Sequence, residues 1–218
     1  NRTQPIFKYT IEGGSGDFKN LGQTWSKPTI TKIDVNGDEK TVLVFGGGYA
    51  TNQDDNTFRS KDSVGNSVFI VEAQNGNLVA EISNDNADYV ISTMEYGIPS
   101  RIAVIDRDFD GKMDHMYVAD VGGHLYRIDV YNGESKNDLF NGKLIYTTSS
   151  GLSVSKNRRY YYAPDVAEIV NKNEHYYAVT IGSGYRAHPL NEDIEDSVVM
   201  LKDKGVFAKE DGLYTFPT

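Results

Sequence analysis

The sequence predicts an all-β fold of the propeller class, in which similar four-stranded sheets are arranged around a common axis. Glycine and tyrosine are abundant, with 21 and 15 residues, whereas proline is scarce, with 6 among 218 residues. Stretches with helical periodicity are hard to find, which favours a β-protein with many turns. One pattern of strands occurs three times along the chain, and such a repeat indicates the architecture.

The first repeat covers residues 24–84. Apolar and alternating residues predict its strands at 27–34, 41–48, 67–72 and 77–82. Pro28 stands just ahead of the first strand, where no backbone donor is needed. The second strand ends in three glycines, at positions 46 to 48, and we expect neighbouring backbones to approach closely there.

The second and third repeats cover residues 97–149 and 160–216. Each again opens with a proline, Pro99 or Pro164. Four antiparallel strands per repeat, at a spacing of about 50–70 residues, are typical of propeller blades. A stack of β-meanders in a sandwich is the alternative. The predicted strands are 98–105, 115–123, 124–131 and 143–147 in the second repeat, and 163–170, 175–184, 196–201 and 212–216 in the third.

Residues 1–218 are expected to form a single, partial propeller domain. Three blades cannot close a ring, because propellers typically carry about four to eight. Residues 5–11 resemble the outer strand of a preceding blade. The chain is therefore predicted to be an arc or fragment of a larger propeller, with degenerate further blades as the alternative.

One loop of the second repeat has the residue pattern of a calcium site. Asp106, Asp108, Asp110 and Asp114 occupy positions 1, 3, 5 and 9 of an EF-hand-like loop, and Gly111 occupies position 6. Carboxylate oxygens favour a hard cation, and a flexible loop rich in them favours calcium over magnesium. The backbone carbonyl of Lys112, at position 7, is the fifth expected ligand. An Asp/Gly turn without a metal is the alternative.

The position of this loop in the repeat supports the calcium interpretation. From the end of the first strand to the first glycine after the second, the first and third repeats have 13 residues and the second has 17. The additional residues are the loop, so a metal site is inserted into one hairpin of one blade. The first repeat keeps only a partial copy, with Asp34, Asn36 and Asp38, which we interpret as a turn.

Composition excludes several classes of function. The net charge of −9 argues against nucleic acid as a partner, because phosphate binding needs a basic surface. No apolar run is long enough to span a membrane. The four histidines lack a metal-ligand spacing, and no nucleophile elbow or phosphate loop occurs. We therefore expect no enzymatic activity.

Several motifs together resemble the C-terminal domain of the PilY/PilC family, whose members act at the type IV pilus tip and in pilus assembly. They lie between residues 24 and 201 and include the calcium loop. The motifs are Thr24–Pro28, Phe45–Tyr49, Tyr96–Ser100, Ile105–Gly111, Val118–Arg127 and Ile181–Leu190.

The resemblance implies a modified β-propeller with one calcium ion, held by Asp106, Asp108, Asp110, Asp114 and the backbone of Lys112. It also implies a factor that regulates pilus extension against retraction and contributes to adhesion and twitching motility. The expected partners are minor or major pilins and, as a further candidate, a host surface. The expected location is extracytoplasmic, at the pilus tip, the cell surface, the outer membrane or the periplasm of a bacterium.

Two other functions remain as alternatives. One is a general adhesion propeller stabilised by calcium, although such modules place similar loops in several consecutive blades. The other is a quinone-dependent enzyme, suggested by the hairpin at residues 68–78. The sequence of this hairpin is typical of any propeller blade, and no group of cofactor-binding residues is evident in the sequence.

Overall fold

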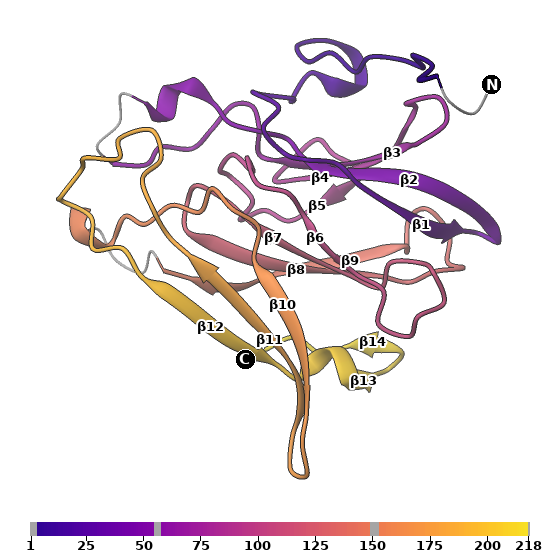
Figure 1. Ribbon diagram of the computed structural model, residues 1–218. Coiled ribbons are helices and arrows are strands. Elements are labelled where there is room, and N and C mark those ends of the chain that lie inside the picture. The colour runs from indigo at the N-terminus through magenta and orange to yellow at the C-terminus, as the bar shows by residue number, and fades with distance from the viewer. Residues whose placement is uncertain (1–3, 55–57, 149–152, 218) are drawn as a thin grey trace.

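Three β-sheets follow one another along the chain, as the repeats do (Figure 1). The structure is a computed structural model and describes residues 4–54, 58–148 and 153–217; residue 149, the predicted end of the second repeat, lies outside them. Regular helix is limited to the 3-10 turns Gly16–Phe18, Thr51–Gln53, Val154–Lys156 and Gly205–Phe207 in these ranges. None of the helices described is long and apolar enough to cross a membrane.

The first two sheets each contain four antiparallel strands in sequential order, as the repeats predict. The short strand β5 (Tyr89–Val90) adds to the first sheet in parallel with β4. The other strands of the first sheet are β1 (Thr29–Val35), β2 (Asp38–Gly46), β3 (Ser67–Glu72) and β4 (Leu78–Ser83). Those of the second are β6 (Ala103–Ile105), β7 (His115–Ala119), β8 (His124–Val130) and β9 (Phe140–Thr147).

The third sheet has three strands, β10 (Asp165–Val170), β11 (His175–Gly182) and β12 (Val198–Asp203). We expected residues 212–216 to supply a fourth. Instead, β14 (Leu213–Tyr214) pairs with β13 (Lys209–Glu210) in a separate hairpin. The buried side chain of Tyr214 packs against His115 of the second sheet, with ring centroids 4.7 Å apart, and this contact places the hairpin away from the edge of β12.

The second sheet lies between the other two, because both of its faces contribute to apolar clusters. Val44, Val68 and Ile82 of the first sheet pack with Met116 and Ile128 on one face. On the other face, side chains of the second and third sheets pack together. This second cluster contains Tyr117, Ala119, Leu125, Val179 and Ile181.

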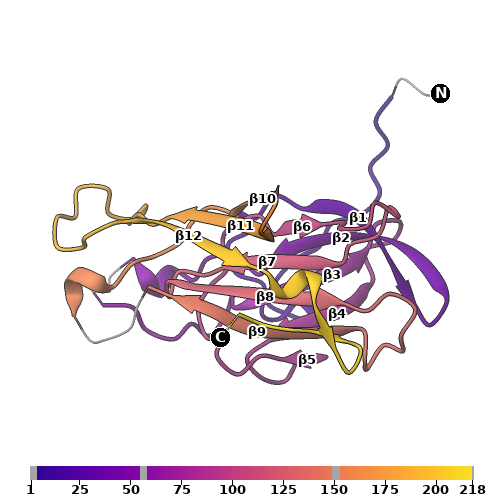
Figure 2. The same cartoon turned by 90° about the horizontal axis from the view of Figure 1, so that it is seen from below.

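The all-β prediction is confirmed. In the part of the chain that the structure describes, the sheets form no closed ring (Figure 2). The chain ahead of Tyr9 extends away from the sheets, whereas the Tyr9 hydroxyl donates to the carbonyl of Ala73 over 3.0 Å.

The expected close approach at the glycine-rich end of β2 is also confirmed. A Cβ atom at Gly46 would lie 2.3 Å from the carbonyl oxygen of Ile98, and one at Gly48 would lie 2.1 Å from that of Gln23. Gly48 also has a φ of +102°. A side chain at either position would displace backbone. Gly46 thus allows β2 to contact the segment that leads into the second sheet, and Gly48 allows the chain after β2 to contact the segment that precedes β1.

Arg127, on β8, links the second and third sheets through ion pairs that are completely buried. Its Nε donates to Asp129 Oδ1 over 2.9 Å, and its Nη1 donates to Asp203 Oδ1, at the end of β12, over 2.9 Å. Burial alone would lower the pKa of Arg127, but the two carboxylates raise it above its ordinary value, so the guanidinium remains charged.

Removing this cation should destabilise the protein severely. Arg127→Met leaves two carboxylates buried without their partner, which typically costs about 3–5 kcal/mol of unfolding free energy. Lys32→Met is the matched control, because Lys32 pairs with Glu39 where both side chains are about half exposed, and it should cost less than about 1 kcal/mol. Urea unfolding measures both; equal losses would show that the buried network does not hold the sheets together.

Candidate metal centre

The loop between β6 and β7 is fixed where it joins the second sheet. Asp106 follows the last residue of β6, and Asp114 precedes the first residue of β7. The backbone N–H of Asp114 donates to the carbonyl of Ile105 over 2.8 Å, and the N–H of Val130 donates to the carbonyl of Asp114 over 2.8 Å. Positions 1 and 9 of the loop are thereby held beside each other by the ladder.

Met113 anchors the end of the loop in the apolar core. Its side chain is completely buried between the first and second sheets. Its backbone N–H donates to the carbonyl of Lys32 over 2.9 Å, and its carbonyl accepts from Asn132 Nδ2 over 3.0 Å. The loop therefore rests on both sheets at one end while its tip faces solvent.

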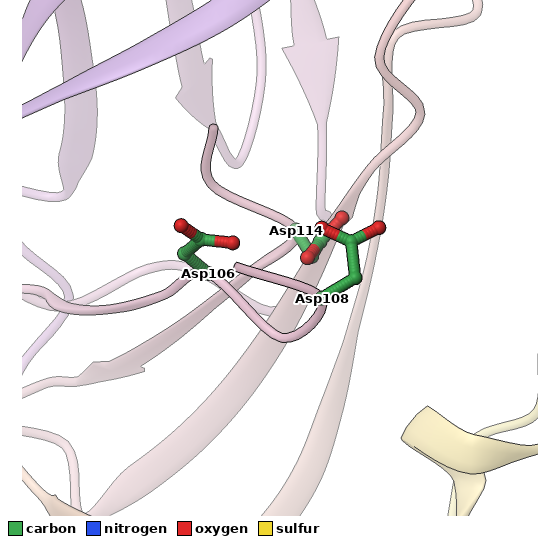
Figure 3. A group of neighbouring side chains, drawn as sticks. All are labelled: Asp106, Asp108 and Asp114. Carbon is green, nitrogen blue, oxygen red and sulfur yellow. The ribbon is translucent and has the colours of Figure 1, made fainter. Parts of the chain in front are cut away.

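Three of the predicted ligands come together. Asp106, Asp108 and Asp114 each offer one carboxylate oxygen, and these oxygens lie within 4.8 Å of one another (Figure 3). Because calcium–oxygen distances are about 2.3–2.6 Å, oxygens around one ion can stand up to about 5 Å apart. The separation is suited to one shared cation.

The electrostatics of these carboxylates also fit a cation. Asp106 Oδ1 is buried and has no hydrogen-bond partner among the described residues. Burial raises the pKa of the Asp114 carboxyl, although the backbone N–H of Arg107 donates to its Oδ2 over 2.7 Å. A cation between these groups would offset the cost of burying their charges. The residues present therefore fit a calcium ion.

Asp110 differs from the other three. Its Oδ2 lies 2.8 Å from Lys112 Nζ, and its Oδ1 accepts from the Lys112 backbone N–H over 2.8 Å. These contacts lower the pKa of Asp110 and hold its carboxylate outside the convergent group. To act as the predicted ligand, Asp110 must exchange the Lys112 ammonium for the ion. The Lys112 carbonyl remains the predicted backbone ligand.

The turn at the tip is built as its sequence predicts. Gly111 has a φ of +90°, and its N–H donates to Asp106 Oδ2 over 2.9 Å. The N–H of Asp110 points toward Asp108 Oδ1 over 3.3 Å. Backbone donors thus hold the acidic side chains on the inner side of the loop.

Arg107 connects the loop to the C-terminal hairpin, a contact that sequence reasoning missed. Its Nη2 donates to the Tyr214 hydroxyl over 2.8 Å, and its guanidinium carbon lies 5.4 Å from the centre of that ring. The two residues are 107 positions apart, and no local pattern marks the pair. An ordered loop therefore contributes to holding β13 and β14.

The partial copy of the loop in the first repeat is a turn. The N–H of Gly37 donates to Asp34 Oδ1 over 2.7 Å, and Asp38 pairs with Lys40 over 2.9 Å. Across the described residues, the only group of three acidic or histidine side chains suited to a metal is that of the β6–β7 loop. His115 lies beside that loop but binds Asp129 through Nδ1 over 2.7 Å.

The sheets and the loop define a class of protein: a β-propeller-type domain with one acidic, cation-competent loop in the first hairpin of one blade. The particular family follows from comparison with known proteins. The chain belongs to the PilY1 β-propeller domain family, whose model matches residues 12–157, and the resemblance seen in the sequence is confirmed.

A solved structure has the same fold. The Pseudomonas aeruginosa PilY1 C-terminal domain matches with a TM-score of 0.62 and 17% sequence identity. The match covers 91% of this chain and 41% of that domain, so the chain spans about two-fifths of the solved domain. Among curated proteins, none matches this sequence.

Replacing one convergent carboxylate should weaken calcium binding. Asp106→Asn keeps the shape of the side chain but removes its charge, and we expect the affinity to fall about tenfold or more because loop charge sets calcium affinity. Asp38→Asn, in the turn of the first sheet, is the matched control and should change nothing. Calorimetry with calcium checks both, and unchanged binding by Asp106→Asn would contradict the ligand assignment.

Proposed function

We propose that this chain is the calcium-binding part of a type IV pilus biogenesis factor and regulates pilus extension against retraction. The single observation that carries the proposal is the convergence of Asp106, Asp108 and Asp114 in a domain of the PilY1 family. A bound calcium ion supplies positive charge among the carboxylates. Asp110 and the Lys112 carbonyl complete the protein ligands, with water as the remaining ligand.

The family supplies the biological setting of the proposal. Its expected partners are minor or major pilins, and its location is extracytoplasmic, at the pilus tip, the cell surface, the outer membrane or the periplasm. Contributions to twitching motility and to adhesion on a host surface follow from that location. A general adhesion propeller stabilised by calcium remains the alternative, and an effect on pilus number separates the two.

The regulatory step is a change in the order of one loop. Without the ion, four carboxylates within nine residues repel one another, so the tip of the loop loosens. With the ion, Arg107 is fixed between Asp114 and Tyr214, and the loop and hairpin present one surface. A partner can respond only if it binds one of these two states more tightly, so it must contact the loop or its neighbours.

Calcium should stabilise only the β6–β7 loop, and the sheets should remain folded without it. The corresponding hairpins β1–β2 and β10–β11 form with short turns. At a calcium concentration 100 times the dissociation constant, binding adds about 2.7 kcal/mol, or about 5–10 °C in Tm for a domain of this size. Thermal scans with calcium and with a chelator check this, and loss of the whole far-UV β signal on chelation would contradict it.

In the full-length protein, loss of the ion should favour retraction. Asp106→Ala should leave few surface pili, and deletion of the retraction motor should restore them. Asp106→Lys places a positive charge in the loop and should partly resemble the calcium-loaded state. Asp38→Ala is the control. If both Asp106 variants were folded and exported and had normal pili and normal twitching, the loop would have a structural role only, and the regulatory proposal would be contradicted.

A further inference from the structure

Phe109, at the tip of the calcium loop, has an unfavourable backbone conformation for its residue type. Its φ is +62°, in the left-handed region. Among the described residues, the other non-glycine residues with positive φ are Asn36, Asn86 and Asp211, whose short polar side chains tolerate this conformation. A phenylalanine there is strained, and glycine or asparagine would satisfy the same turn at lower cost.

No contact of the Phe109 side chain offsets this strain. The Phe109 side chain is 82% exposed. Within the described ranges it takes part in no aromatic pair, no cation–π contact and none of the four apolar clusters. Strain kept at an exposed position points to a contact outside the chain.

We propose that Phe109 is the anchor through which the calcium-loaded loop docks a protein partner, by inserting its ring into an apolar pocket. The inference rests on the proposed function, because it names the part of the loop that the partner contacts. Aromatic side chains that enter a partner's pocket commonly dominate the affinity of a protein interface.

Calcium controls this anchor through the two residues beside it. Asp108 and Asp110 flank Phe109 in sequence, and both are exposed. Without the ion, burying the ring in a pocket would also desolvate the carboxylate of Asp108 and the Asp110–Lys112 ion pair, which is costly. With the ion, these carboxylates turn their charge toward it, and the ring becomes the outermost apolar group of a more neutral tip.

The charge of the chain selects the kind of partner. The chain as a whole is acidic, with a net charge of −9. Complementary charge on the partner is favoured, which fits an apolar pocket bordered by lysine or arginine. An anionic membrane is disfavoured, because such a surface attracts basic rather than acidic segments. We therefore assign a protein with a basic-rimmed apolar pocket.

The test distinguishes the contribution of the Phe109 side chain from that of calcium binding. In the full-length protein, Phe109→Gly should bind calcium as tightly as the parent or more tightly, because the strain at φ +62° is relieved. Surface pili should nevertheless be lost, as in Asp106→Ala. Phe109→Asn should behave in the same way, whereas Phe109→Trp should keep its pili.

Leu190→Gly is the matched control, because Leu190 is 94% exposed elsewhere on the surface and should have no effect. Normal pili in Phe109→Gly, with the protein exported, would overturn the proposal. Two other results would also overturn it. If the parent floated with anionic vesicles in the presence of calcium and Phe109→Gly did not, the loop would bind a membrane. If the parent self-associated in sedimentation and Phe109→Gly did not, the partner would be a second copy of the chain. Weak calcium binding by the parent protein would instead contradict the proposed function, regardless of the phenotype of Phe109→Gly.

Discussion

The rest of the structure depends on the buried charges of Arg127, Asp129 and Asp203. In a medium of low dielectric, each of these groups needs its partner, because an unpaired charge there is far more costly than at the surface. The Tyr117 hydroxyl donates to Asp203 over 2.8 Å, and Arg127 Nη2 donates to the carbonyl of Thr215 over 2.7 Å. These bonds hold the end of β12 and the C-terminal segment against the second sheet.

The candidate metal centre is continuous with this network. His115, the first residue of β7, pairs in register with Asp129, and its ring binds the carboxylate that also holds Arg127. The preceding residue is Asp114, the most buried of the candidate ligands. The ninth position of the loop is thus set by interactions in the interior, while Asp108 and Asp110 are exposed. A cation bound at this loop would therefore connect its fixed base to its exposed tip.

The sequence alone predicts the blades and the loop because both are local. A strand pattern repeated three times, and carboxylates at alternate positions, need only neighbouring residues to be recognised. The close backbone approach at Gly46 follows from the same kind of reasoning. The prediction of a fourth strand at 212–216 is wrong because tertiary contacts of Tyr214 prevail over strand propensity.

Long-range and electrostatic features are not predictable in this way. Arg127 and Asp203 are 76 positions apart, and Arg107 and Tyr214 are 107 apart, so only the folded chain brings them together. The pairing of Asp110 with Lys112 is local, but spacing cannot show whether a carboxylate faces a lysine or an ion. The left-handed φ of Phe109 is likewise a property of the closed loop, since the residue type by itself argues against it.

These features together explain why the tip of one loop is a suitable place for regulation. A change inside the core would have to break paired, buried charges and would unfold the protein before it signalled anything. At the tip, the interactions to be broken are weaker, because they involve solvent-exposed carboxylates, one strained residue and one lysine that pairs with a carboxylate. The base of the loop is held on the second sheet by backbone hydrogen bonds of Asp114, so a cation bound at the tip would change the charge and order of the tip without moving the sheets. The fold would thus confine the effect of such an ion to the surface that a partner can contact.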